Sequence, residues 1–121
     1  MPELAVAKFR RAVEVTKDTP FNSFYLAALG HAYAMAGNRP EAENILQTLS
    51  ERGKKSYVSP FDLALVHAAL GEKDEAFALL KKAIAERSTF LVYTKWEPRL
   101  DPLRSDPRFT QILKRIGLPT K

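Results

Sequence analysis

The side chains that could take part in catalysis or metal binding are few in this chain of 121 residues. Two histidines, His31 and His67, are present, and the lack of cysteine excludes disulfides and thiolate chemistry. Ligand-type residues are too few for a zinc site, and the sequence has no glycine-rich phosphate loop and no Ser-His-Asp set or carboxylate pair with a reason to converge. We therefore predict a protein that is not an enzyme and that uses no metal or cofactor.

The net charge of +5 is confined to the end of the chain. Residues 1–86 hold 11 Lys/Arg and 11 Asp/Glu, whereas residues 87–121 hold 8 Lys/Arg and 3 Asp/Glu. Spaced basic residues of this kind are more typical of a solvated helix face than of a phosphate-binding track. The main ones are Arg99, Arg104, Arg108, Lys114, Arg115 and Lys121. We keep weak nucleic-acid contact through this tail only as an alternative.

The longest uncharged stretch runs between Asp18 and Arg39. Pro20, Asn22 and Ser23 interrupt it, and it is too rich in alanine to span a bilayer. The first 15 residues carry charges where a signal peptide needs an apolar core. We expect a soluble, cytoplasmic protein with no membrane partner.

An internal repeat organises the chain. A shift of 34 residues places Gly37 on Gly71 and Ala42 on Ala76. The other aligned pairs are Leu29 and Leu63, Gly30 and Ala64, Tyr33 and His67, Glu41 and Glu75, Leu46 and Leu80, and Leu49 and Ala83. Small residues align with small ones and bulky residues with bulky ones. This period and pattern resemble the tetratricopeptide repeat, a pair of antiparallel helices that stacks into a solenoid.

The resemblance implies an all-α fold, a right-handed superhelical solenoid of antiparallel helix pairs with a C-terminal capping helix. Periodicity and helix-end signals predict helices at 3–17, 22–36, 39–52, 59–70 and 73–87. We expect one domain, 1–121, made of the second helix of an incomplete repeat (1–20), two repeats (22–55 and 57–87) and a remainder (88–121). Because the first helix has the spacing of a second helix, we interpret the chain as part of a longer protein.

Helix-end signals agree with these pairs. Asn22 or Ser23 is expected to cap the second helix, Asn38 the third in a capping box with Glu41, and Ser59 the fourth, with Pro60 at its first position. Gly30, in the middle of a predicted helix, costs about 1 kcal/mol relative to alanine, so we expect another helix to approach it closely.

The tail departs from the repeat pattern. Phe90, Tyr93 and Trp96 precede two prolines, which predicts an irregular crossing over 88–103. Asp106 is expected to cap a last helix whose apolar face covers the repeats, and Gly117 to end it. The segment LDPLRSDPRF, residues 100–109, resembles the ending of tetratricopeptide arrays in bacterial multidomain regulators such as winged-helix transcription regulators and Ser/Thr kinases.

The resemblance also implies a peptide-binding groove lined by the first helix of each repeat. The residues at these places are Phe24, Ala27, Ala28, His31, Met35, Val58, Phe61, Asp62, Leu65 and Ala68. Cochaperones of the heat-shock class grip a C-terminal carboxylate with Lys, Asn and Arg at places held here by Ala27, His31, Val58 and Asp62. This departure favours an apolar peptide or helix as the ligand. The same residues could instead pack within the protein.

We predict a protein-interaction module of a larger bacterial regulatory or signalling protein, with a protein or peptide partner. Self-association through the exposed N-terminal helix, or a purely structural spacer, is the second interpretation.

Overall fold

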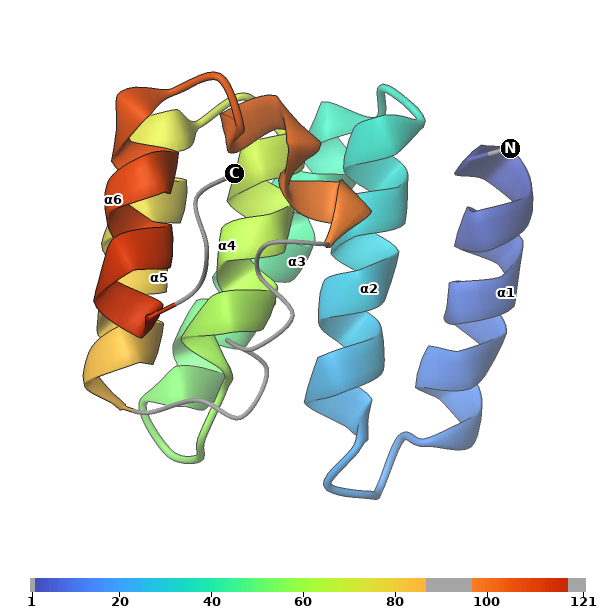
Figure 1. Cartoon of the computed structure of the whole chain (residues 1–121). Coiled ribbons are helices and arrows are strands. Elements are labelled where there is room, and N and C mark those ends of the chain that lie inside the picture. The colour runs from blue at the N-terminus through green and yellow to red at the C-terminus, as the bar shows by residue number, and fades with distance from the viewer. Residues whose placement is uncertain (1, 87–96, 118–121) are drawn as a thin grey trace. The chain divides into compact units, whose positions relative to one another are not determined.

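A computed structural model describes residues 2–86 and 97–117 of the chain (Figure 1). These residues form six α-helices and one 3-10 helix. The α-helices are α1 (Pro2–Val15), α2 (Asn22–Met35), α3 (Arg39–Gly53), α4 (Pro60–Ala69), α5 (Lys73–Ala85) and α6 (Pro107–Ile116), and the 3-10 helix is η2 (Pro98–Leu103). The all-α class is confirmed, and all five helices predicted before residue 88 are present with nearly the predicted bounds.

Close contacts divide the chain into two units, residues 1–58 and 59–121. In the first unit, α1 and α3 each pack on α2 as antiparallel neighbours (Figure 1). In the second unit, α4 and α5 form an antiparallel pair, η2 packs on α4, and α6 packs on α5. The predicted pairing of consecutive helices is therefore confirmed within each unit.

Helix α2 is apolar on several sides because it lies between two neighbours. Its buried residues are Asn22, Leu26, Ala27, Ala28, Leu29, Gly30 and Ala32, which no single stripe of a helix could contain. Gly30 is among them, as expected for a position where a side chain would be crowded. The alanine-rich sequence thus suits a helix in the middle of its unit.

The turn between paired helices has the same conformation in both units. Gly37 ends α2 with φ 80° and Gly71 ends α4 with φ 78°, in the left-handed region that glycine adopts without strain. The amide of the residue after each glycine donates to the carbonyl oxygen five residues earlier, at 2.9 Å in both turns. The 34-residue repeat of the sequence is therefore also a repeat of backbone geometry.

The expected helix caps are only partly present. The hydroxyl of Ser59 accepts from the amide of Asp62 at 3.4 Å, and Asp106 accepts from the amide of Arg108 at 2.9 Å, which confirms both of these caps. The capping box at Asn38 is wrong, because this residue precedes α3 but its side chain makes no capping hydrogen bond.

Neither Asn22 nor Ser23 caps α2 as predicted. The N-cap position belongs to Phe21, which has no side chain that could accept a hydrogen bond. Asn22 is the first helical residue and is 4 % exposed. Its amide group donates to the carbonyl oxygen of Val13 at 2.9 Å, and its oxygen accepts from Arg52 at 2.6 Å. Asn22 therefore joins α1, α2 and α3, because a buried amide must find partners.

The second unit has a core that includes the C-terminal tail. Phe61, Leu65 and Phe77 pack in it together with Leu100 and Leu103 of η2. Phe109 and Ile112 of α6 are also buried, which confirms the predicted capping helix. The left-handed Gly117 ends α6 as expected. The predictions for Phe90, Tyr93 and Trp96 fall outside the described residues.

Candidate functional site

Exposed apolar side chains of the predicted groove are found on α2. Phe24 is 43 % exposed and Met35 58 % exposed, and His31, half-buried, lies between them on the same side of the helix. The ring of Phe24 contacts the edge of Tyr25, with centroids 5.1 Å apart. We call the row Phe24, Ala27, Ala28, His31 and Met35 the α2 face.

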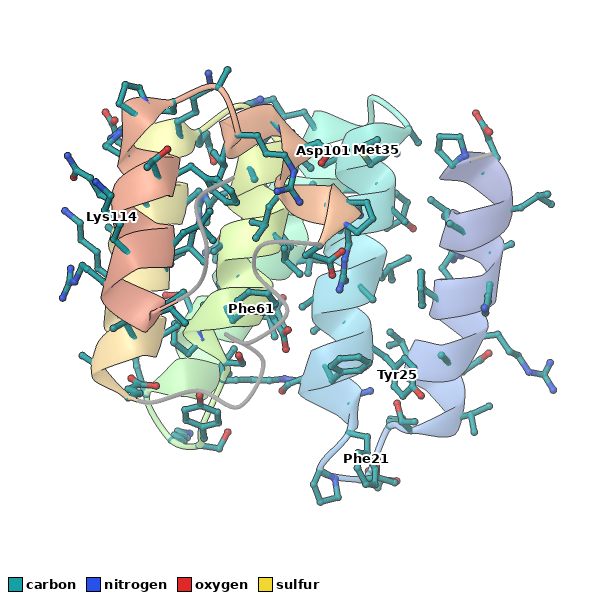
Figure 2. All side chains as sticks on the ribbon, in the orientation of Figure 1. Phe21, Tyr25, Met35, Phe61, Asp101 and Lys114 are labelled. Carbon is teal, nitrogen blue, oxygen red and sulfur yellow. The ribbon has the colours of Figure 1, made fainter. Side chains whose placement is uncertain are left out.

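The two alanines of the α2 face are buried. Ala27 is 3 % exposed and Ala28 9 % exposed, so neither offers much area to a ligand. Recognition on this face would depend on Phe24 and Met35, the latter near the C-terminal end of α2 (Figure 2).

The residues predicted on α4 lie in the core of the second unit. Phe61 is 3 % exposed, Leu65 2 % and Ala68 1 %, and all three share a cluster with Leu100 and Leu103 of η2 (Figure 2). The interpretation that these positions pack within the protein, left open by the sequence, describes them in this structure. A peptide could contact them only by displacing η2.

Asp62 is the one charged residue of the predicted groove. It is half-buried at the start of α4, and this burial raises its pKa from 3.8 to about 6, against the opposing effect of the Arg99 guanidinium. Val58, also half-buried, directly precedes the cap of α4. The ten predicted residues are thus divided between the two units, and a groove that needs both remains a prediction.

The histidines have structural surroundings. Nδ1 of His67 lies 2.8 Å from Oε1 of Glu72, a contact that links the end of α4 to the start of α5. His67 is close to the helix–helix turn, as its alignment with Tyr33 indicates. In residues 2–86 and 97–117, no group of three or more His, Asp or Glu side chains is placed to hold a metal ion.

The basic tail is largely neutralised by its own carboxylates. Arg99 pairs with Glu97, and Arg104 donates to Asp101. Arg108 bonds Asp106 and also Asp74 of α5, and its guanidinium lies 4.4 Å from the ring centre of Phe77. Three of the positive charges that suggested nucleic-acid contact are therefore already paired.

A second surface, which the sequence analysis missed, lies within the first unit. It is an open groove of about 760 Å³ between α1 and α3, with α2 as its floor. Its lining residues are Ala7, Arg10, Arg11, Val13, Glu14, Lys17, Asn22, Leu29, Tyr33, Glu41, Ile45 and Arg52. We call it the basic groove. The signal that could have found it is the set of cations in residues 8–17, which the sequence analysis used only to exclude a signal peptide.

The described helices include none that is both long and apolar enough to cross a membrane. Comparisons of the chain with models of protein families, with curated proteins and with solved structures give no match.

Proposed function

We propose that the chain is a protein-interaction module, a right-handed solenoid of tetratricopeptide-like helix pairs that binds a peptide or helix of a partner. The observation that carries this proposal is the repeated turn, in which Gly37 and Gly71 have the same φ and the same hydrogen bonding 34 residues apart. Repeats of this type stack side by side and present long helical surfaces for binding.

The buried positions of the repeat support the same proposal. Ala42 and Ala76 are both fully buried at equivalent places, as are Leu49 and Ala83. A small residue at such a place lets paired helices approach closely, and it recurs because each repeat solves the same packing problem.

The α2 face is the part of the predicted groove that a ligand can reach. Phe24 and Met35 are exposed apolar side chains, and Met adapts to ligands of different shape. Phe61 is unsuited as a test position, because its burial means that truncation would destabilise the second unit.

A peptide selection tests the proposal. Peptides selected from a random library on the wild-type chain should bind about tenfold or more weakly to the double variant Phe24→Ser, Met35→Ser, since a few apolar anchors dominate such interfaces. The matched control is Leu4→Ser, Val15→Ser, which removes two exposed apolar side chains of α1 and should bind normally. Equal binding by all three proteins, with circular dichroism melts unchanged, would exclude the α2 face.

Self-association is a second candidate, favoured by the exposure of α1. This helix has no buried residue, and Leu4 and Val15 are 66 % and 69 % exposed on one side of it. Lys8 and Arg11 share that side, and like charges oppose a symmetric contact. Sedimentation at increasing concentration separates the candidates: a dimer that Leu4→Ser, Val15→Ser abolishes would favour self-association, and a monomer throughout would favour the module.

A further inference from the structure

The basic groove lies on the side of α2 opposite to the α2 face. Its α2 residues, Asn22, Leu29 and Tyr33, are about half a helical turn away from Phe24 and Met35. A ligand bound there would leave the α2 face open. The volume of about 760 Å³ falls within the usual range of about 300–1,000 Å³ for ligand clefts.

The walls of the basic groove carry an excess of positive charge. Four cations line it against the two carboxylates of Glu14 and Glu41. Arg10, Arg11 and Lys17 make no ion pair with any described residue, although Glu14 lies one helical turn from both arginines. These charges are therefore available to an anionic ligand.

The fourth cation, Arg52, is held in place. Its Nη1 donates to Oδ1 of Asn22 at 2.6 Å and to Oγ of Ser23 at 3.3 Å. Its Nε and Nη2 have no acceptor among residues 2–86 and 97–117. A guanidinium that is already oriented loses little freedom when it binds a carboxylate through its remaining donors.

Charge and apolar area are arranged along the groove. Because α1 and α3 run antiparallel to α2, Lys17 and Arg52 lie at the end where α2 begins, and Glu41 lies toward the other end. Between the walls, the buried side chains of Leu29 and Ile45 provide an apolar floor.

We propose that the basic groove binds an acidic peptide segment of a partner protein, whose Asp or Glu carboxylates pair with Arg11, Lys17 and Arg52. An apolar side chain of the same segment packs on Leu29 and Ile45. A nucleic acid fits less well, because a phosphate backbone needs a continuous basic track and the groove contains two carboxylates.

Binding of defined peptides to the full chain tests this proposal. The probe is a fluorescent octapeptide of six glutamates and two leucines, and the comparison peptide has glutamine in place of every glutamate. By fluorescence anisotropy we expect a Kd on the order of 10–100 µM for the acidic peptide and at least about tenfold weaker binding of the glutamine peptide. The double variant Arg11→Glu, Lys17→Glu should weaken the acidic peptide by about tenfold or more.

The matched control is Lys81→Glu, Lys114→Glu, which changes the net charge equally at exposed positions of α5 and α6. Unchanged affinity in this control supports the groove, whereas an equal loss in both double variants reduces the effect to net charge and overturns the proposal. Tighter binding of a DNA duplex than of the acidic peptide, lost with Arg11→Glu, Lys17→Glu, would overturn it in favour of a phosphate backbone.

Discussion

At the scale of single residues, Asn22 shows how a polar side chain can be fixed by structure rather than by its local sequence. Its sequence position suggests a helix cap, but the side chain is buried and joins Val13, Thr16 and Arg52 across three helices. Capping needs only neighbours in sequence, whereas this role depends on residues that come together only after folding. That is why sequence reasoning selected the right residue for the wrong reason.

We predict that Asn22→Ala destabilises the chain by about 1–3 kcal/mol, because it leaves the Arg52 guanidinium and the Val13 carbonyl without a partner in a buried place. Thermal and urea unfolding followed by circular dichroism measure the change. Asn38→Ala is the matched control, since Asn38 is exposed and makes no capping hydrogen bond, and its effect should stay within about 0.5 kcal/mol. Equal effects of the two variants would show that the Asn22 contacts contribute nothing.

Asp62 predicts a pH dependence of stability. Burial raises its pKa from 3.8 to about 6, so the folded chain binds the proton more tightly than the unfolded chain. Its contribution is fully favourable below pH 3.8 and is lost as the pH rises through about 6. At pH 7, Asp62→Asn should therefore unfold with a free energy up to about 3 kcal/mol higher than wild type, with little difference at pH 4. The exposed Asp18→Asn is the control, and a gain at pH 7 no larger than this control contradicts the prediction.

At the scale of elements, the sequence predicts the helices well and the tail only in part. Apolar periodicity, glycine turns and the Ser59 cap are local signals, and each of the five helices before residue 88 follows from them. The packing of η2 on α4 is not local: Leu100 and Leu103 reach Phe61 and Leu65 only through the fold of the second unit. The same limitation made α4 look like an open groove face and hid the basic groove between α1 and α3.

The two glycine turns should respond alike to substitution. Gly37→Ala and Gly71→Ala should each cost about 1 kcal/mol, because both residues have a positive φ, while the added Cβ would meet no other atom within 4 Å. Gly53→Ala is the contrasting variant, since Gly53 ends α3 with ordinary helical geometry and open space, and alanine there should stabilise by up to about 1 kcal/mol. Chemical unfolding of the three variants measures these values, and a loss at Gly53 as large as at the turns would refute the argument.

The 3-10 helix is expected to contribute as much as a regular core helix. Leu100→Ala should lower the free energy of unfolding by about 2–5 kcal/mol, because Leu100 is fully buried against α4. Leu4→Ala, at a leucine that is 66 % exposed, should change it by less than about 0.5 kcal/mol. A small effect at Leu100 would mean that η2 is only loosely held and that Phe61 and Leu65 are open to a ligand after all.

At the scale of the whole molecule, stability is expected to be uneven along the chain. Helix α1 has no buried residue and packs on α2 alone, whereas α4 and α5 share a core with η2 and α6. Local opening is easiest where few apolar contacts must be broken. The helix that carries most cations of the basic groove is therefore also the one expected to open most readily.

Native-state hydrogen exchange measures this difference directly. The amides of α1 should exchange fastest among the α-helices of the first unit, and those of α4 and α5 should approach the protection set by global unfolding. Asn22→Ala should accelerate exchange in α1 more than in α5, because Asn22 ties Val13 to Arg52 within the first unit. An acidic peptide bound in the basic groove should slow exchange in α1, because binding stabilises the closed form of that helix. Uniform protection of α1 and α5 would instead show that the chain opens as one cooperative body, and then the weak packing of α1 would not predict its dynamics.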